Sequence, residues 1–355
     1  MRAVVCHGPK DYRLESVPEP AVPEGGAVIQ VEAVGICASD VKCFEGAPMF
    51  WGDATRRAYC EPPVVPGHEF VGRIAEVAAD AASRWCVAAG DRVVVEQIVP
   101  CGECLYCQRG SYWLCRRHDI FGFHQATQGA MAEYMALPAG SRLHRISERL
   151  VAAHAAFAEP LSCSLHAAER GDVGFDDVVV VAGAGPIGLG MVAGAKRRGP
   201  RCVVALDRFA ARLELAKRCG ADVVLDVSSD DAPAAVLELT AGYGCDVYFD
   251  ATGDPSGVPQ GLAMLRKQGR FVEYSVMRQP VSVDWTVIGD TKELDIRGGH
   301  LGAHCWPPAI RMLEDGVLPM DGIVSHRLPI EEFASGLALV ADGRESVKVS
   351  LSLQV

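Results

Sequence analysis

Short apolar runs broken by glycine and proline fill the first part of the chain. Residues 27–34 and 91–95 group Val, Ile and Ala between turn-forming residues. Apolar runs of this length with turn residues on either side are typical of β-strands. We therefore predict an irregular, β-rich domain that extends to about residue 165.

Beyond about residue 165, apolar strand-like runs alternate with helix-like stretches such as 210–219 and 258–267. The predicted strands are 178–181, 202–206, 223–225, 247–249 and 270–274. Alternation of this kind predicts a parallel sheet covered by helices on both faces. The last part of the chain, from about residue 300, holds a helix-like stretch at 308–314 and a strand-like one at 346–353.

Size and charge narrow the class of protein. A chain of 355 residues predicts two domains, and 49% apolar with 22% charged residues is typical of a globular protein. The net charge of -11 disfavours nucleic acid or an anionic membrane as partner. The uncharged stretch 178–195 has about the length of a membrane span, but its glycines and Pro186 fit a strand-to-helix turn better. The apolar N-terminal run is too short for a signal peptide, so we expect a cytoplasmic protein.

Four of the fourteen cysteines are grouped at Cys101, Cys104, Cys107 and Cys115, with spacings of two, two and seven residues. Four thiolates at this density predict a closed, structural zinc site. An iron–sulfur cluster also uses Cys-x2-Cys-x2-Cys, but its usual fourth cysteine after three residues, followed by Pro, is missing. We expect most of the other cysteines to be small buried residues.

A glycine-rich turn follows the first strand of the predicted parallel sheet. Residues 178–188 read Val-Val-Val-Val-Ala-Gly-Ala-Gly-Pro-Ile-Gly, a strand that leads into Gly-x-Gly-x-x-Gly. Gly183 permits the tight turn, Gly185 lets the backbone approach a pyrophosphate, and Gly188 lets the next helix pack on the sheet. This arrangement predicts a dinucleotide site with the phosphate at the helix N-terminus.

The second strand of this unit ends at Asp207, about 20 residues after the last glycine, where an acid binds the ribose hydroxyls. Asp207 would repel a 2′-phosphate, which favours NAD over NADP. The neighbouring Arg208 could accommodate that phosphate, so NADP stays an alternative cofactor. We also assign Ile187 and Arg212 to the cofactor site.

Three stretches supply further metal-ligand candidates: Gly35-Ile36-Cys37-Ala38-Ser39-Asp40, Gly67-His68-Glu69 and Phe157-Ala158-Glu159-Pro160-Leu161. Their spacing alone does not identify a metal site. Together with the glycine-rich turn and the four cysteines, however, they resemble the zinc-containing medium-chain dehydrogenase/reductase family over essentially the full length. The resemblance implies an α/β protein: a doubly wound Rossmann NAD-binding domain at 166–299, and a β-rich, GroES-like zinc-binding catalytic domain at 1–165 completed by 300–355.

The resemblance also implies metal ligands. Cys37 and His68 match the family's first two catalytic zinc ligands, and Glu69 matches an acid that can enter or leave the coordination sphere. Glu159 falls where ethanol-type enzymes place a cysteine and polyol dehydrogenases a glutamate. Which of the two glutamates binds zinc in the resting state stays open. The implied cofactors are NAD and two zinc ions per subunit, one catalytic and one structural.

Catalytic roles follow from the same resemblance. Asp40 matches the carboxylate that orients His68 through its other ring nitrogen, and Ser39 matches the hydroxyl that takes the substrate proton. Many relatives continue this relay with a histidine five residues after the cysteine, where this chain has Lys42. The path of the proton beyond Ser39 therefore stays open.

Further motifs resemble the polyol branch of the family, and within it enzymes of the four-carbon polyols erythritol and L-threitol. They are Cys-His-Gly at 6–8, Phe-Trp-Gly at 50–52, Phe-Ala-Glu-Pro-Leu-Ser-Cys-Ser-Leu-His at 157–166 and Gly-His-Leu-Gly at 299–302. The implied reaction is hydride transfer from a small polyol to NAD, giving the ketose. A sorbitol or xylitol enzyme and a threonine 3-dehydrogenase are alternatives, and a silent NAD-binding relative is the non-enzymatic one.

The loop at 44–59 borders the substrate pocket in this family. Its aromatic residues could form an apolar wall, with Glu45 and Asp53 binding extra hydroxyls, or could pack the loop onto its own domain. The resemblance also suggests a homotetramer or homodimer that forms through the sheet edge near residues 293–298.

Overall fold

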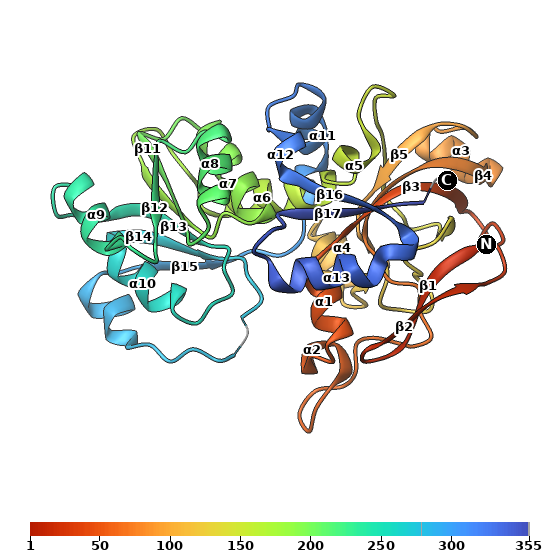
Figure 1. The fold of residues 1–355 in the computed structure, drawn as a ribbon, viewed down its shortest axis with the longest axis horizontal. Coiled ribbons are helices and arrows are strands. Elements are labelled where there is room, and N and C mark those ends of the chain that lie inside the picture. The colour runs from red at the N-terminus through yellow and green to blue at the C-terminus, as the bar shows by residue number, and fades with distance from the viewer. Residues whose placement is uncertain (278, 354–355) are drawn as a thin grey trace. The chain divides into compact units, whose positions relative to one another are not determined.

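The computed structural model describes residues 1–277 and 279–353, and the chain divides into two compact units (Figure 1). The first unit comprises Met1–Glu159, Trp306–Asp315 and Val324–Val355, and the second comprises Pro160–Cys305 and Gly316–Ile323. The chain passes from the first unit to the second inside helix α6 (Ala158–Arg170).

A mainly antiparallel sheet forms the centre of the first unit, in the order β16-β17-β3-β4-β5-β9, with β8 also paired to β3. Its strands are β3 (Ala27–Ile36), β4 (Glu69–Val77), β5 (Arg92–Val95), β8 (Tyr134–Leu137), β9 (Leu143–Arg145), β16 (Val324–Pro329) and β17 (Lys348–Ser352). β17 pairs with β3, so the end of the chain completes a sheet begun near its start, as the adjacent red and blue strands show (Figure 1). The strands predicted at 27–34, 91–95 and 346–353 are confirmed.

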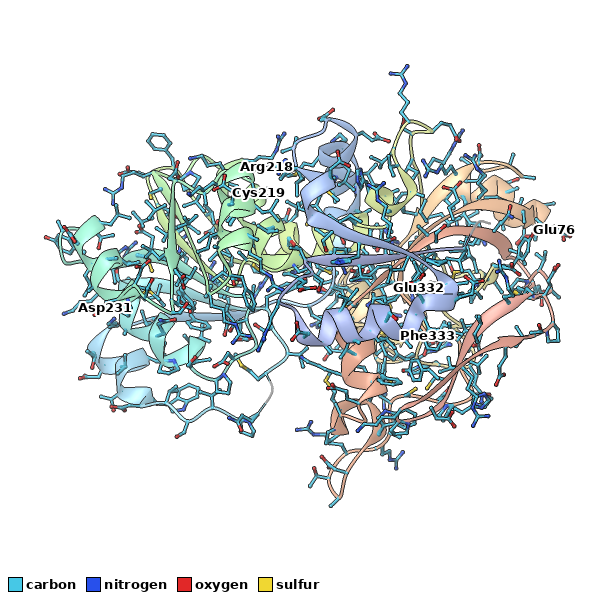
Figure 2. The ribbon with its side chains drawn as sticks, in the orientation of Figure 1. Glu76, Arg218, Cys219, Asp231, Glu332 and Phe333 are labelled. Atoms are coloured by element: carbon cyan, nitrogen blue, oxygen red, sulfur yellow. The ribbon has the colours of Figure 1, made fainter. Side chains whose placement is uncertain are left out.

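Short elements surround this sheet. The strands are β1 (Arg2–Gly8), β2 (Asp11–Ser16), β6 (Ile98–Val99) and β7 (Asp119–Ile120). The helices are α1 (Ala38–Phe44), α2 (Pro48–Trp51), α3 (Ala79–Trp85), α4 (Leu105–Gln108), η1 (Tyr112–Leu114), α5 (Ala152–Ala155), α11 (Trp306–Glu314), η4 (Ile330–Glu332) and α13 (Phe333–Asp342). Glu332 and Phe333 mark the start of α13 (Figure 2). The helix predicted at 308–314 is confirmed as the greater part of α11.

In the second unit, the described residues form a parallel six-stranded sheet in the order β12-β11-β10-β13-β14-β15. The strands are β10 (Val178–Ala182), β11 (Cys202–Asp207), β12 (Val223–Asp226), β13 (Cys245–Asp250), β14 (Leu265–Glu273) and β15 (Asp295–Gly298). Every residue of β10 is buried, which explains its unbroken run of valines. The predicted doubly wound sheet and its first four strands are confirmed, and the order reverses between β10 and β13, as it does where such sheets bind ligands.

Helices α7 (Pro186–Lys196), α8 (Ala210–Arg218), α9 (Ala232–Leu239) and α10 (Gly257–Met264) connect these strands. α8 ends at Arg218, with Cys219 as its C-cap (Figure 2). The remaining elements are η2 (Val287–Thr291), η3 (Ala303–Cys305) and α12 (Met320–Ile323). No helix in the described ranges is long and apolar enough to cross a membrane, and the uncharged stretch 178–195 divides into β10 and α7.

The prediction of a helix over 258–267 is wrong at its end. α10 stops at Met264, and β14 starts at Leu265, which lies opposite Cys245 in the parallel sheet. Leu265 is buried in the core of this unit together with Tyr248 and Phe271. Burial in the sheet therefore overrides the helical pattern of the last three residues.

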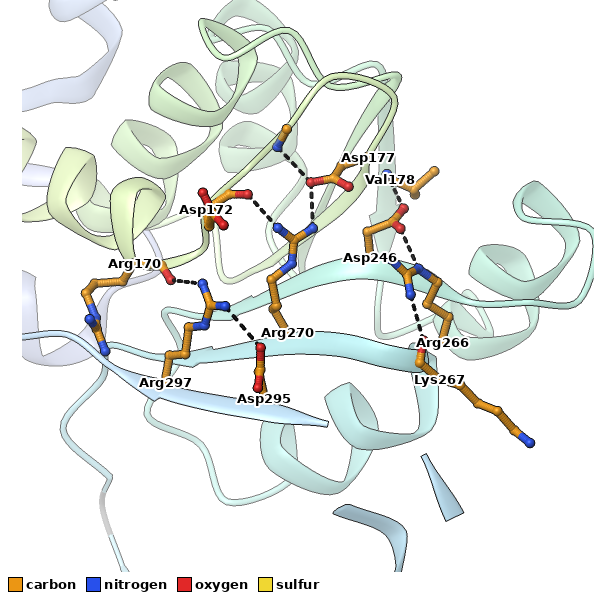
Figure 3. A network of polar contacts seen from close by, with 11 residues as sticks. Arg170, Asp172, Asp177, Val178, Asp246, Arg266, Lys267, Arg270, Asp295 and Arg297 are labelled. Atoms are coloured by element: carbon orange, nitrogen blue, oxygen red, sulfur yellow. Dashed lines mark hydrogen bonds and ion pairs between the residues drawn. The ribbon is translucent and has the colours of Figure 1, made fainter. Parts of the chain in front are cut away.

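Charged residues tie the strands of the parallel sheet together (Figure 3). Asp246 accepts a hydrogen bond from the backbone N–H of Val178 (2.7 Å) and one from Arg266 (2.5 Å). Arg270 on β14 binds Asp177, just before β10, at 2.7 Å. These contacts link the sequence-distant strands β10, β13 and β14.

Candidate metal and cofactor sites

The end of β3 and the start of α1 place the first candidate ligand. Cys37 is the N-cap of α1 with extended backbone (φ −91°, ψ 156°), and its N–H donates to Asp40 Oδ2 at 2.8 Å. Asp40 lies in the first turn of α1 and is buried. The Cys-x-Ser-Asp sequence thus forms a local helix start that fixes both the thiol and the carboxylate.

Pairing of β3 with β4 brings the second and third candidates to the same place. Gly35 of β3 lies opposite Glu69, the first residue of β4, so Cys37 and His68 extend from neighbouring strand ends. The ligand atoms of Cys37, His68 and Glu69 all lie within 4.8 Å of one another. Gly67 has φ +99°, a conformation that favours glycine and explains why Gly precedes the histidine.

Carboxylate and hydroxyl groups flank the His68 ring. Asp40 Oδ1 lies 3.7 Å from His68 Nδ1, and both atoms are buried without a hydrogen-bond partner in the part of the chain that the structure describes. Ser39 Oγ lies 3.5 Å from His68 Nε2. The structure therefore brings together Ser39, Asp40 and His68.

The electrostatic surroundings of His68 favour a positive charge. Burial lowers the pKa of His68. Asp40 and Cys37, with a smaller effect from Glu159, together outweigh burial and raise the pKa from 6.5 to about 10. Burial raises the pKa of Asp40. A half-buried thiol, a buried imidazole and buried carboxylates that together favour a cation are the donor set that zinc prefers. The residues present therefore fit a zinc ion.

The two glutamates of the predicted ligand set have different hydrogen-bond donors. Lys348 on β17 is buried, and its Nζ lies 2.8 Å from Glu69 Oε1 and 2.5 Å from Glu69 Oε2. Glu159 accepts a hydrogen bond from the side-chain amide of Gln97, which is also buried. Neither donor was predicted from the sequence; the available signal for Lys348 was a lysine inside the apolar run 346–353.

The four-cysteine lobe (residues 101–115) brings its thiols together as predicted from their spacing. Cys101, Cys104, Cys107 and Cys115 form one group of potential ligands. Cys107 Sγ lies 3.6 Å from Cys104 Sγ and 4.0 Å from Cys101 Sγ. A tetrahedral zinc site with Zn–S bonds of about 2.3 Å has S–S edges of about 3.8 Å, so these thiols fit zinc.

Backbone groups of the lobe also favour thiolates. The N–H of Arg116 donates to Cys104 Sγ at 3.5 Å, and the N–H of Cys104 donates to Cys101 Sγ at 3.4 Å. The Arg116 N–H, with that of Cys107, lowers the pKa of Cys104 to about 6. Thiolates are the form that binds zinc.

The glycine-rich turn has the geometry that a dinucleotide site needs. Gly183 has φ +90°, and Gly185 is the N-cap of α7. A Cβ on Gly188 would lie 1.7 Å from the carbonyl oxygen of Gly183. Ile187 lies in the first turn of α7. Close approach of helix and turn, with Gly185 as the N-cap of α7, is the arrangement that binds a pyrophosphate at a helix N-terminus, so the turn fits NAD.

Asp207 lies at the end of β11, beside this turn. Its Oδ2 accepts the N–H of Ala184 (2.7 Å), and its Oδ1 accepts the N–H groups of Arg208 (2.7 Å) and Phe209 (3.0 Å). Arg212 Nη1 lies 3.9 Å from Asp207 Oδ2. The structure therefore groups the turn, Asp207 and Arg212, the residues assigned to the cofactor.

Aromatic residues of the loop at 44–59 pack onto their own unit, the second of the two alternatives above. Phe50 is buried and stacks on Phe123 with ring centroids 5.0 Å apart. Trp51 donates from Nε1 to the carbonyl of Cys43 (2.7 Å). Asp53 binds Thr55 within the loop (2.7 Å). Phe123, which no sequence motif indicated, also lies near the candidate metal site, with its ring centroid 5.7 Å from that of His68.

Comparison with known proteins gives the class to which this fold and these sites belong. Residues 186–315 match the family described as zinc-binding dehydrogenase, and residues 23–148 match the alcohol dehydrogenase GroES-like domain. The chain belongs to the family of zinc-binding alcohol dehydrogenases, as the resemblance predicted.

Individual relatives are similar over nearly the whole chain. The chain is 59% identical to an erythritol/L-threitol dehydrogenase of Mycolicibacterium smegmatis, over 99% of this chain and 97% of the relative. An alcohol dehydrogenase, TADH, from Thermus sp. ATN1 has a TM-score of 0.87 at 30% identity, with full coverage of both chains. An alcohol dehydrogenase from Escherichia coli CFT073, solved with NADH, has a TM-score of 0.86 at 27% identity and 99% coverage of each chain.

Proposed function

We propose that this protein catalyses the zinc- and NAD-dependent oxidation of a small polyol of the erythritol or L-threitol type to its ketose. The observation that carries the proposal is the convergence of Cys37, His68 and Glu69 within 4.8 Å, in a chain 59% identical to an erythritol/L-threitol dehydrogenase. The buried Glu159, at the position where polyol enzymes have a glutamate, supports a polyol over a simple alcohol.

Each residue of the site has a role in this reaction. Cys37 and His68 would hold the catalytic zinc, with Glu69 and Glu159 as the available carboxylates. When bound, zinc lowers the pKa of the alcohol oxygen, and NAD accepts the hydride. Asp40 Oδ1 lies 3.7 Å from His68 Nδ1, where its carboxylate would orient the ring.

Ser39 is the proton acceptor in this proposal. Its Oγ lies 3.5 Å from His68 Nε2, the ring nitrogen that does not face Asp40. A hydroxyl there takes the alcohol proton at Oγ while its own proton leaves toward solvent. Asp207 would bind the ribose of NAD in the second unit, beside the turn at Gly183 and Gly185.

Assembly and location complete the proposal. β15 is the edge strand of the six-stranded sheet in the described residues, and its Ile296 is exposed. An exposed edge can pair with a second copy, so we infer a homodimer or homotetramer. We place the activity in the cytoplasm, because cysteine ligands of zinc must stay reduced.

A substrate panel tests the function. Tetritols, pentitols, hexitols and threonine are each incubated with the zinc-loaded enzyme and NAD, and absorbance of the reduced cofactor is followed. We expect the highest kcat/KM for erythritol or L-threitol. A higher kcat/KM for a hexitol or threonine would assign that compound as the substrate instead. If no sugar alcohol led to reduction of NAD, the proposal would be refuted.

The cofactor is tested with Asp207→Ala. The variant should lose its preference for NAD over NADP, because the carboxylate no longer repels a 2′-phosphate. An unchanged preference would refute the role of Asp207.

A further inference from the structure

A short turn at residues 121–127 packs directly on the segment that carries His68. Gly122 has φ +90°, and a Cβ there would lie 2.7 Å from the backbone nitrogen of Gly67. Backbone hydrogen bonds of 2.9 and 3.1 Å within the turn fix its shape. The ring of Phe123 lies 5.7 Å from that of His68. The residue that follows Phe123 is therefore held close to the candidate metal site.

The residue after Phe123 is His124, and its ring is fixed from two sides. Its Nδ1 lies 3.2 Å from Asp119 Oδ1, and its ring packs edge-on against that of Tyr59, with centroids 4.5 Å apart. A carboxylate only accepts hydrogen bonds, so Nδ1 carries the proton and Nε2 keeps a lone pair. Nε2 has no hydrogen-bond partner among the described residues and is not buried. The ring therefore presents one accepting atom in a fixed direction.

The charges around His124 favour a neutral ligand. Arg117 binds the second oxygen of Asp119 at 2.7 Å and compensates that carboxylate. Glu61 lies beside the turn, where it accepts the N–H of Gln125 at 3.2 Å and adds a negative charge. This balance disfavours an anionic group such as a phosphate, whereas a hydroxyl can donate its hydrogen to Nε2.

We propose that His124 is a specificity-determining residue whose Nε2 binds a substrate hydroxyl remote from the reacting carbon, and that Asp119 positions its ring. The inference rests on the proposed function, because a polyol carries such a further hydroxyl and a simple alcohol does not. No sequence motif indicated either residue. His124 thereby adds a contact that distinguishes polyols from alcohols with a single hydroxyl.

Two substitutions separate substrate binding from packing. In His124→Asn, the amide nitrogen takes the place of Nδ1 and keeps the hydrogen bond to Asp119, but no group remains at Nε2. In His124→Gln, the longer side chain brings its amide to the place of Nε2. We expect His124→Asn to lower kcat/KM for erythritol or L-threitol about three-fold to ten-fold, mainly through KM, as loss of one hydrogen bond does. His124→Gln should keep most of the wild-type value.

Controls locate the effect at the remote hydroxyl. Butane-2,3-diol lacks the terminal hydroxyls of a tetritol, so its kcat/KM should be the same for His124→Asn and the wild type. His326→Asn removes an exposed imidazole whose Nδ1 lies 3.0 Å from Ser325 Oγ, and should leave every substrate unaffected. The zinc content and Tm of His124→Asn should stay at the wild-type values. Calorimetric titration of the zinc-loaded enzyme with erythritol alone should show the same loss of affinity in His124→Asn.

Three results would overturn the inference. His124→Asn could bind and oxidise tetritols as the wild type does, or could lose oxidation of butane-2,3-diol to the same extent. His124→Gln could also be the weaker of the two variants, which would leave His124 only its structural contact with Asp119. A wild type that oxidises no polyol refutes the proposed function, whereas an active wild type with unaffected variants refutes only this inference.

Discussion

Lys348 and Glu69 form an ion pair that is almost completely buried, with side chains 5% and 2% exposed. Burial lowers the pKa of Lys348, but Glu69, with smaller effects from Cys37 and Glu159, raises it above its usual value. Neither charge has solvent to stabilise it, so each depends on the other. The pair links β17, near the end of the chain, to β4 at the candidate metal site.

We predict that Lys348→Met destabilises the protein by about 3–5 kcal/mol, because it leaves the Glu69 carboxylate buried without its cation. Urea unfolding followed by circular dichroism measures the loss. The double variant Lys348→Met/Glu69→Gln should recover much of it, since no uncompensated charge remains. Equal stability of the two variants would show that the ion pair is not the cause.

We predict that Ser39→Ala lowers kcat roughly a hundred-fold to ten-thousand-fold, the range for loss of a proton-transfer group. Zinc content should stay at the wild-type value, because Ser39 is not a ligand. Ser39→Thr keeps the hydroxyl and serves as the control. A Ser39→Ala enzyme with wild-type kcat and pH profile would exclude the proton-accepting role.

The sequence alone indicates site residues that belong to local motifs. It does not indicate residues that reach the site only through tertiary contacts. The Cys-x-Ser-Asp start of α1 and the Gly-His-Glu start of β4 are local, so Cys37, His68 and Glu69 could be chosen in advance. Lys348 and Gln97 reach their partners only through strand pairing and burial. Neither has a spacing that marks it.

The position of helix α7 depends on the absence of a side chain at Gly188. A Cβ there would lie 1.7 Å from the Gly183 carbonyl oxygen, far inside van der Waals contact. We predict that Gly188→Ala displaces the start of α7 and weakens NADH binding about ten-fold or more, a loss of at least about 1.4 kcal/mol. Fluorescence titration with NADH measures it. Gly174→Ala, whose Cβ would meet only Asp177 at 3.7 Å, should bind NADH normally.

Two acids end neighbouring strands of the parallel sheet. Asp250 of β13 and Glu273 of β14 are register partners, and the buried Asp250 Oδ2 has no hydrogen-bond partner among the described residues. Burial, and then the charge of Asp250, raise the pKa of Glu273 from 4.5 to about 7. The folded state therefore favours the protonated form of Glu273.

This shift predicts a pH dependence of stability. A raised pKa contributes stability below the unfolded value of about 4.5, and that stability is lost as the pH rises through 7. Glu273→Gln should therefore be more stable than the wild type at pH 8, by roughly 1–3 kcal/mol, and not at pH 4. Urea unfolding at both pH values tests this, with the exposed Glu76→Gln as control (Figure 2). A difference that does not change with pH would contradict the prediction.

Regular elements follow the apolar pattern where burial and periodicity agree. The valine run of β10 and the helix-like 210–219 stretch both appear as predicted. The boundary between α10 and β14 does not, because Leu265 fits either pattern and its pairing with Cys245 decides the outcome. Such decisions depend on contacts that are distant in sequence.

The parallel sheet of the second unit is inserted in the sequence between strands that belong to the sheet of the first unit. β16 and β17 join the sheet of the first unit although the whole parallel sheet precedes them in sequence. A change in apolar pattern can reveal such an insertion. The transition itself, between Glu159 and Pro160, falls inside the continuous helix α6, where no composition change marks it.

Two sets of candidate metal ligands within one unit predict two different consequences of metal loss. The four-cysteine lobe is a closed set whose thiols hold a segment with few regular elements, so we expect metal binding there to contribute to folding. The Cys37–His68 site is built on β3, β4 and α1, which are fixed by the main sheet. We expect a metal bound there to contribute mainly to chemistry.

We therefore predict that Cys104→Ser loses one zinc per subunit and several kcal/mol of stability, seen as a fall in Tm of about 10 °C or more, or as aggregation. Cys37→Ser should also lose one zinc, and essentially all activity, while its Tm stays near that of the wild type. Metal analysis, calorimetry and the NAD assay on both variants separate the two roles. If both variants stay active, or if both unfold alike, the assignment of one structural and one catalytic metal site is wrong.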